Sequence, residues 1–342
     1  MSNLTTGNRT RWPRRRALTI MAAACGAPIL GVIGRPEARA LPRPFEWRGS
    51  ALGASARITL LHPDPAAARR LLSRCLAEVR RLESVFSLYD DRSELARLNR
   101  QGFLRGASLD LRHLVAESQR LSQLTSGAFD ITVQPLWQCY ADHFRNNADA
   151  AAPPPESELA RRRDLVGYRR IDISGSTIGF LQSGMAATLN GIAQGYITDR
   201  VADLLRHEGC SQVLVDLGEI AALDAPATAP GWRVQIAHPT RPGESLGDVT
   251  LVNRAVASSS GLATRFDASG RHHHLFDPRT GRSAPSPLSV SVVSRRAWLS
   301  DALSTALAIL PRRAAAPLLR QTGADTAIFV HSNGKAAWIP AT

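Results

Sequence analysis

The stretch "SDALSTALAIL", Ser300 to Leu310, combines a helical apolar pattern with an acid and several hydroxyl groups. Its apolar residues predict the start of an amphipathic helix. Asp301 and Thr305 are four residues apart, so on a helix they lie on one face, one turn from each other, with Ser304 beside them. A carboxylate and hydroxyls placed in this way can converge on one metal ion. The alternative is a simple helix cap, with Ser300 as the N-cap, Asp301 stabilised by the helix dipole and Thr305 solvated.

Helices and strands are interspersed along the rest of the chain without a regular alternation. Apolar residues at helical spacing predict helices over 66–89, 111–127 and 195–209, and residues 148–158 form a Pro-rich loop. Strands are predicted by alternating or β-rich sequence at 53–62, 170–173, 177–180, 212–217, 231–239, 245–253, 255–260, 272–278 and 288–294. This irregular order favours the α+β class.

Residues 1–40 have the pattern of an export signal and are not expected to be part of the fold. A basic start precedes an apolar run from Ala17 to Ile33 and a small-residue ending, Ala38-Arg39-Ala40. The pair Arg15-Arg16 fits a twin-arginine signal, which is used by proteins exported already folded. We therefore expect a periplasmic protein whose single domain, 41–342, begins near Leu41 after cleavage.

Two other roles for this N-terminal segment are disfavoured. A retained membrane anchor requires about 20 apolar residues, and the run here is shorter and broken by Gly and Pro. A lipid anchor at Cys25 would leave only Ala17 to Ala24 as the apolar region, which is short.

Composition and charge narrow the functional classes. The chain has 342 residues, of which 44% are hydrophobic and 21% charged, an ordinary globular balance that allows one large domain. Residues 1–40 hold seven Arg and one Glu, so they carry +6 of the formal net charge of +13. The remaining basic residues are scattered, apart from the triple Arg161 to Arg163, which indicates a solvated surface and not a nucleic-acid interface. Cys75, Cys139 and Cys210 form neither a disulfide framework nor a CxxC metal site, and we expect them to be small buried hydrophobes.

Six polar motifs, four of which contain glycine, follow one another at the ends of apolar elements. They read "ESVFSLYDDRSELARLN", "SGAFDITVQPLW", "LNGIAQGYITD", "VLVDLGEI", "HLFDPRTG" and "SDALSTAL". In this order and spacing they resemble the FAD:protein FMN transferase (ApbE) family. The resemblance implies a T-fold-related architecture with mostly antiparallel sheets flanked by helices. It also implies an enzyme that splits FAD at its pyrophosphate, transfers the FMN half to a Ser or Thr hydroxyl of an acceptor protein and releases AMP.

The resemblance assigns roles to individual residues. Mg²⁺ is implied at Asp301, Ser304 and Thr305, together with the backbone carbonyl of Gly191. FAD contacts are implied at Leu52, Tyr89, Ala128, Phe129, Asp130, Thr188 and Gln194. Phe129 could instead be a core residue, and Asp130 a turn residue.

The chain departs from the family pattern at three of these positions. Leu52 replaces a common Met, Thr188 replaces an Asp, and Gln194 takes the place of a Lys or Glu. The stretch "TLNGIAQGYITDRV", together with the twin-arginine signal, is similar to the NosX branch. That branch serves the flavin-carrying, NosR-like membrane partner of nitrous oxide reductase.

Three adjacent histidines, His272 to His274, precede the turn motif "DPRTG". On an extended backbone, neighbouring side chains point to opposite faces, so the three cannot all reach one ion. His274 matches the family pattern of a His, two apolar residues and D-P-x-T-G, which makes it the implied general base for the acceptor hydroxyl. His272 and His273 are expected at the surface, and Asp277 is expected to build the turn with Pro278 and Gly281. Asp130 and Asp216 are the next residues to consider as the base.

Other functional classes remain as alternatives. A periplasmic FAD-binding carrier would need Tyr89 and Phe129 but not Asp301, Thr305 and His274 together. An FAD pyrophosphatase would split the same bond without a protein acceptor. Paired Cys or His ligands of a thiol- or metal-trafficking protein are not found in the sequence, and export argues against nucleic-acid binding.

Overall fold

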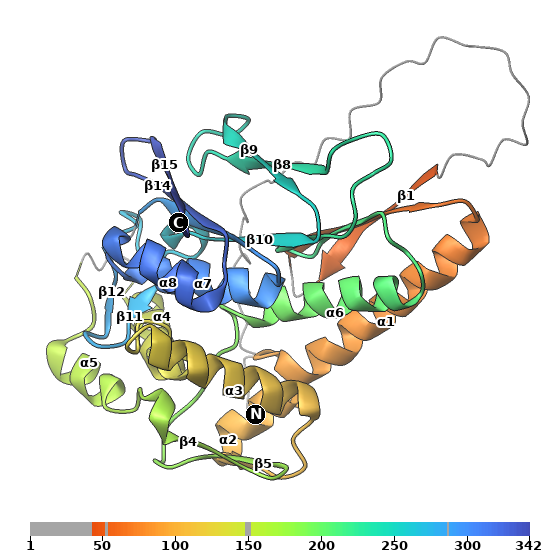
Figure 1. The fold of residues 1–342 in the computed structure, drawn as a ribbon. Coiled ribbons are helices and arrows are strands. Elements are labelled where there is room, and N and C mark those ends of the chain that lie inside the picture. The colour runs from red at the N-terminus through yellow and green to blue at the C-terminus, as the bar shows by residue number, and fades with distance from the viewer. Residues whose placement is uncertain (1–42, 52–53, 148–151, 286) are drawn as a thin grey trace, which may run out of the picture.

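The computed structural model describes residues 43–51, 54–147, 152–285 and 287–342 (Figure 1). The predicted export signal, Cys25, Leu52 and the start of the Pro-rich loop lie outside these residues. Among the described residues, no helix is both long and apolar enough to cross a membrane.

An eight-stranded sheet forms the centre of the molecule, and each pair of neighbouring strands in it is antiparallel. Its order is β1-β2-β6-β7-β10-β13-β14-β15. The strands are β1 (Arg43–Ala51), β2 (Ala54–His62), β6 (Val213–Asp216), β7 (Ile220–Ala222), β10 (Arg254–Ser259), β13 (Ser289–Ser294), β14 (Thr326–Val330) and β15 (Ala336–Pro340). Because β10 and β13 are central and buried, helices that pack on them are held at the middle of the sheet.

Helices cover one face of this sheet, as Figure 1 shows. They are α1 (Pro65–Phe86), α6 (Ala193–His207), α7 (Ala297–Ile309) and α8 (Ala315–Thr322). α7 packs on β10 and β13, and α6 packs on β6, β7 and α7. On the opposite face lies a hairpin of β8 (Trp232–Ala237) and β9 (Ser245–Leu251), whose Trp232 and Leu251 bury against Ile220 and Val256 of the sheet.

A smaller group of elements packs around α1 and the loop that bears the histidines. It contains helices α2 (Glu94–Gln101), α3 (Leu109–Leu124), α4 (Gln134–Asn146) and α5 (Glu156–Arg163). Its strands are β3 (Phe103–Leu104), β4 (Ile171–Ser174), β5 (Thr177–Phe180), β11 (Phe276–Asp277) and β12 (Arg282–Ser283). The aromatic rings of Tyr140 and Phe144 on α4 pack with Phe266 and Phe276, and the centroids of Tyr140 and Phe276 are 4.8 Å apart. This aromatic cluster fixes the histidine loop on α4.

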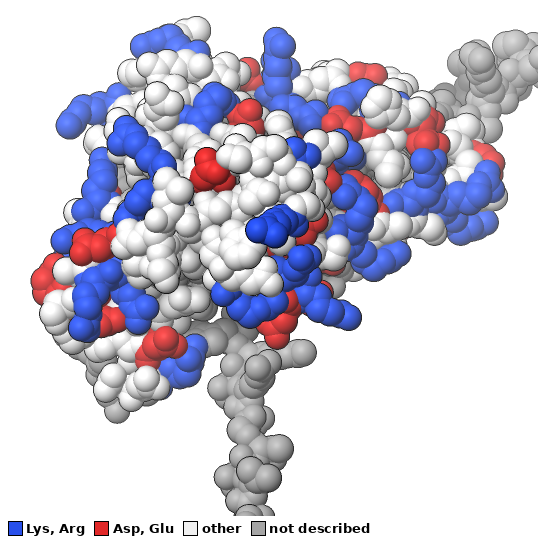
Figure 2. Space-filling view, turned by 90° about the horizontal axis from the view of Figure 1, so that it is seen from below, with Lys and Arg blue, Asp and Glu red and all other residues white. Residues whose placement is uncertain are grey.

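The α+β prediction is confirmed, and the described residues contain no closed barrel. The helices predicted over 66–89, 111–127 and 195–209 correspond to α1, α3 and α6. Cys75, Cys139 and Cys210 are buried free thiols, as expected. On the face seen in Figure 2, Lys and Arg side chains are interspersed with Asp and Glu and form no continuous stripe.

Candidate active site

The polar face of α7 is buried against the sheet. Asp301 is 4% exposed, Ser304 is fully buried and Thr305 is half-buried, so the alternative of a simple helix cap with a solvated Thr305 is wrong. α7 begins at Ala297, three residues before Ser300, and Arg296 takes the N-cap position. The Ser300 hydroxyl instead lies 2.8 Å from that of Ser294, inside the structure. The buried polar side chains of α7 therefore lie along the helix after its first turn begins, and not at its first residue.

Hydroxyl groups from β10 and α7 meet at this buried face. Ser259, the last residue of β10, places its Oγ 2.7 Å from Oγ of Ser304 and 3.1 Å from Oγ1 of Thr305. Gly191 lies against the same group, because a β-carbon at position 191 would be 3.0 Å from Thr305 Oγ1 and 3.5 Å from the ring of Phe129. The structure thus brings together Gly191, Ser304, Thr305 and Phe129.

Asp301 joins this cluster to the start of α6. Its Oδ2 accepts a hydrogen bond of 3.2 Å from the backbone N–H of Gly195. Gln194, the preceding residue, is buried and donates from Nε2 to the carbonyl of Leu217, 3.2 Å away. The motifs "LNGIAQGYITD", "VLVDLGEI" and "SDALSTAL" therefore converge on one region, although they are far apart in the sequence.

The donor set at this region fits Mg²⁺. Its groups are oxygens only: one carboxylate, three hydroxyls and the adjacent backbone of Gly191. No group of three or more His, Cys, Asp or Glu side chains that could hold a metal occurs among the described residues. Mg²⁺ is commonly bound by one or two carboxylates and completes its shell with water and substrate phosphates. The site therefore suits a metal ion shared with a pyrophosphate and not an all-protein cage.

The residues implied in FAD contacts differ in their surroundings. Ala128 and Phe129 are buried, and Thr188 is half-buried, with its N–H bonded to the carbonyl of Ile131 at 2.7 Å. Tyr89 is 67% exposed in the loop after α1. A large exposed aromatic ring can serve as a stacking surface for a flavin or adenine.

Asp130 is engaged in building a turn. Its carboxylate accepts from the N–H and the hydroxyl of Thr132, at 2.8 and 2.6 Å, and from the N–H of Tyr168 at 2.9 Å. Burial raises the pKa of Asp130, although these hydrogen bonds act in the opposite direction. The turn interpretation of this residue is the one that its hydrogen bonds support.

The histidine loop orients His274. Both its backbone N–H and its Nδ1 lie near the carbonyl of Thr264, at 3.1 and 3.2 Å. Because a carbonyl only accepts, Nδ1 carries the proton, and Nε2 is the basic nitrogen of the neutral ring. Thr264 follows Ser259 by five residues, so one short segment links this histidine to the hydroxyl cluster.

The expectation that His273 lies at the surface is wrong. Its side chain is 7% exposed, its Nε2 lies 3.0 Å from the carbonyl of Ala284, and its Nδ1 accepts from the N–H of Leu275. Burial lowers the pKa of His273. The ring packs on Gly261, where a β-carbon would come within 3.0 Å of it. The backbone here is not a regular strand, since only an isolated bridge pairs His273 with Arg265, so strict alternation does not hold.

The turn prediction for Asp277 is confirmed. Its carbonyl accepts from the N–H groups of Thr280 and Gly281, and its carboxylate pairs with Arg279. Gly281 has a φ of +71°, the left-handed conformation that glycine adopts without strain.

Known proteins share this sequence pattern and this fold. The sequence profile of the ApbE family matches residues 52–329. The chain belongs to the ApbE family. The FAD:protein FMN transferase of Vibrio cholerae is 30% identical over 245 residues, which is 70% of this chain and 72% of that protein. The corresponding enzyme of Treponema pallidum is 29% identical over 325 residues, 88% of each chain.

Solved structures show the ApbE fold as well. The ApbE protein from Thermotoga maritima superposes with a TM-score of 0.76 at 25% identity, over 86% of this chain and 96% of that one. The flavin transferase ApbE from Vibrio cholerae superposes with a TM-score of 0.74 at 24% identity, over 87% of this chain and 97% of that one. The predicted ApbE-like architecture and the prediction of a transferase are confirmed.

Two polar residues of this ApbE-family chain were not identified from the sequence. Ser259 is the second of three serines at the end of the strand predicted over 255–260, and this polar ending of an apolar strand is the available signal. Asp199 lies four residues after Gly195 on the buried part of α6. An acidic residue among apolar neighbours is the sequence signal that could have identified it. Burial raises the pKa of Asp199 to about 6, although Arg296 and two backbone N–H groups lower it.

Proposed function

We propose that this ApbE-family protein transfers FMN from FAD to a Ser or Thr hydroxyl of an acceptor protein, with Mg²⁺ held by Asp301, Ser304, Thr305 and the carbonyl of Gly191. The observation that carries the proposal is the cluster of Ser259, Ser304 and Thr305 hydroxyls beside Gly191, with Asp301 one helical turn before Thr305. The curated relatives named above are FAD:protein FMN transferases.

The transfer is one displacement at phosphorus. The acceptor oxygen bonds to the phosphorus of the FMN half, and the bond from that phosphorus to the bridging oxygen breaks. AMP leaves with the bridging oxygen, and the hydroxyl proton passes to the base. When bound, Mg²⁺ neutralises charge on the pyrophosphate oxygens, which is the main requirement of phosphoryl transfer. The protein's own contribution is to position these groups.

His274 is the proposed base. Its Nδ1 proton is held by the Thr264 carbonyl, which directs basic Nε2 away from that contact. Tyr89 and Phe129 are the proposed aromatic contacts of FAD, and Ala128, Asp130, Thr188 and Gln194 are further proposed contacts. Leu52, which lies outside the described residues, completes the proposed FAD contacts.

The cellular setting is a further part of the proposal. Arg15-Arg16 supports export of domain 41–342 to the periplasm by the twin-arginine route, without a lipid anchor at Cys25. The stretch "TLNGIAQGYITDRV" supports the NosX branch, and hence a NosR-like membrane flavoprotein as the acceptor.

One assay separates this function from its alternatives. The purified protein is incubated with FAD, with and without Mg²⁺, and with either the periplasmic domain of a NosR-like protein or the membrane proteins of the producing cells. Mg²⁺-dependent AMP release together with flavin fluorescence on an acceptor band is the expected result. AMP release with no labelled protein would favour an FAD pyrophosphatase, and FAD binding without AMP release would favour a carrier.

A further inference from the structure

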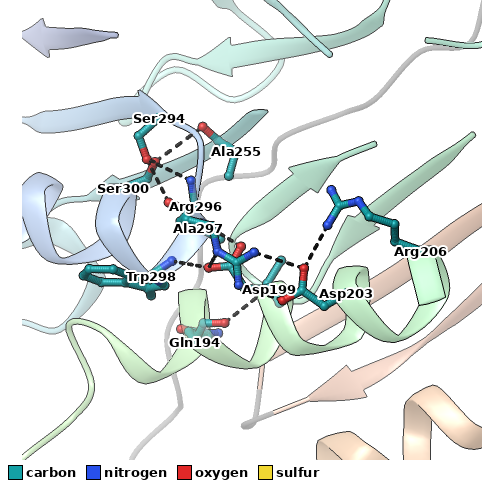
Figure 3. Close-up of polar contacts among 11 residues, drawn as sticks. Gln194, Asp199, Asp203, Arg206, Ala255, Ser294, Arg296, Ala297, Trp298 and Ser300 are labelled. Carbon is teal, nitrogen blue, oxygen red and sulfur yellow. Dashed lines mark hydrogen bonds and ion pairs between the residues drawn. The ribbon is translucent and has the colours of Figure 1, made fainter. Parts of the chain in front are cut away.

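α7 begins without a cap of its own. Its N-cap residue, Arg296, makes no side-chain capping bond, and the first helical residue, Ala297, is fully buried. A buried helix start needs acceptors for its first N–H groups. Figure 3 shows the carboxylate of Asp199 on α6 between these groups, and it accepts from the N–H of Ala297 at 2.9 Å and from that of Trp298 at 3.0 Å.

The reverse contact also exists. α6 has no side-chain cap at its N-cap residue, Ile192, and its third residue is Gly195. The N–H of Gly195 donates to Asp301 on α7. Each helix therefore supplies an aspartate to the first turn of the other. Asp199 follows Gly195 by one turn, and Asp301 follows Ala297 by one turn, so both bonds lie along a single line of contact.

This line of contact has little freedom to shift. A β-carbon at Gly195 would lie 2.3 Å from the carbonyl oxygen of Ala297, so the two backbones touch. Arg296 adds an ion pair to Asp203, with Nη2 to Oδ2 at 2.8 Å, one turn further along α6. The start of α7 is thus fixed on α6 one turn before Asp301, which makes its own bond to Gly195.

We propose that Asp199 is a positioning residue for the metal-binding face of α7. By accepting the first two amides of the helix, it holds Asp301, Ser304 and Thr305 opposite Gly191. This inference rests on the proposed function, because it takes Asp301 as a ligand of Mg²⁺. It predicts a coupling between two places: loosening the first turn of α7 weakens Mg²⁺ binding, and Mg²⁺ binding tightens that turn.

The test compares Asp199→Asn with Asp203→Asn in the full chain. Asn at position 199 keeps the shape and one acceptor, but turns an NH₂ group toward the second amide. Asp203→Asn is the matched control, because Asp203 pairs with the same Arg296 without touching the amides of α7. Mg²⁺ binding is measured by calorimetry in the presence of FAD, and unfolding by heat. Loss of a residue that orients a metal ligand weakens metal binding about 10- to 100-fold.

We expect Asp199→Asn to raise the Kd for Mg²⁺ by about tenfold or more, and Asp203→Asn to change it less than about twofold. A lower melting temperature with an unchanged Kd would make Asp199 merely structural and overturn the inference. Equal weakening by both variants would also overturn it. A wild-type protein that binds no Mg²⁺ would overturn the proposed function itself, which separates the two failures.

A measurement on the wild-type protein keeps the inference testable if Asp199→Asn does not fold. Hydrogen exchange is followed in a peptide that contains the amides of Ala297 and Trp298, with and without Mg²⁺. Slower exchange of these amides on Mg²⁺ addition is expected from the reciprocity of the coupling. Exchange that Mg²⁺ leaves unchanged, under conditions where calorimetry shows binding, would overturn the inference.

Discussion

Ser259 and Ser304 place their hydroxyl oxygens 2.7 Å apart, although one ends β10 and the other lies within α7. The antiparallel pairing of β10 with β13, the strand that precedes α7, brings these distant segments together. The Ser259 hydroxyl also lies 3.1 Å from that of Thr305, so it contacts both α7 hydroxyls. A strand end from another part of the sheet thus completes the polar face of the helix.

Asp301→Asn is expected to abolish most Mg²⁺-dependent transfer while the fold persists. Asp301 is the carboxylate of the proposed metal site, and an amide keeps its shape and its acceptor for the Gly195 N–H. The measurements are turnover over a range of Mg²⁺ concentrations and the far-ultraviolet circular dichroism spectrum. Near-wild-type turnover at saturating Mg²⁺ would exclude Asp301 as a ligand.

His274→Ala is expected to bind FAD and Mg²⁺ as the wild type does, but to label the acceptor about 10² to 10⁴ times more slowly. A Ser or Thr hydroxyl is a weak nucleophile at neutral pH, so loss of the base slows transfer and leaves binding intact. The single-turnover rate of acceptor labelling and the flavin-binding constant are measured together.

His272→Ala is the control for this variant, because His272 is close in sequence to His274 but its ring packs on Tyr140 and Phe144. His273→Ala is unsuitable as a neutral control, since its ring is buried and hydrogen-bonded at both nitrogens. Equal loss of rate in His272→Ala and His274→Ala would mean that the loop acts as a unit. The base would then be sought at Asp216 or Asp130.

Long amphipathic helices were predictable from the sequence. α1 buries one face, and α6 is buried on all sides up to Asp199 and on one face after it; the apolar residues of both repeat at helical spacing, and their extents match the predictions closely. The start of α7 was not predictable in the same way. The groups that cap it lie on Asp199, 98 residues earlier in the chain, and no local signal marks such a partner.

Short elements and side-chain directions were less predictable. β14 is apolar along most of its length and carries no alternation, so periodicity does not distinguish it from a buried helical segment. For the site, the motifs indicated residues that the structure brings together, among them Gly191, Ser304 and Thr305. They did not indicate Ser259, whose role depends on the pairing of strands, or the burial of His273.

Gly195→Ala is expected to destabilise the protein by about 1–3 kcal/mol, because the added methyl group forces α6 and α7 apart. The nearest atom would be a backbone oxygen, that of Ala297 at 2.3 Å, which cannot rotate away. Unfolding in urea gives the free-energy change. Gly179→Ala is the control, since the nearest atom to its β-carbon would be 3.9 Å away. A Gly195→Ala variant as stable as the wild type would contradict the close contact.

Replacing Arg15 and Arg16 together by Lys is expected to hold an uncleaved precursor in the cytoplasm, because the twin-arginine route reads that pair. Cell fractionation and the size of the protein on a gel report the result. A single Lys replacement at Arg9, which lies outside the pair, serves as the control. Normal export and cleavage of the double variant would indicate the general secretory route.

Asp216→Asn is expected to stabilise the protein at pH 7 and to have little effect at pH 4. Burial raises the pKa of Asp216 to about 6, against a hydrogen bond from the Gly218 N–H and the charge of Arg57. A raised carboxyl pKa means that the folded state holds the proton more tightly than the unfolded state. Stability from this group is therefore present at low pH and is lost as the pH rises toward 6. The ionised carboxylate costs up to about 3 kcal/mol at pH 7, which an amide avoids.

Asp277→Asn provides a comparison of opposite sign. Although burial raises the pKa of Asp277, its hydrogen bonds with Arg279 lower it overall. Its stabilisation is present above the ordinary carboxyl pKa and is lost only as the pH falls through the lower, folded value. Asp277→Asn is therefore expected to be less stable than the wild type at both pH 4.5 and pH 7. Urea unfolding at pH 4, 4.5 and 7 gives the free energy of unfolding of the wild type, Asp216→Asn and Asp277→Asn. A constant difference between Asp216→Asn and the wild type from pH 4 to pH 7 would show that Asp216 does not titrate in this range.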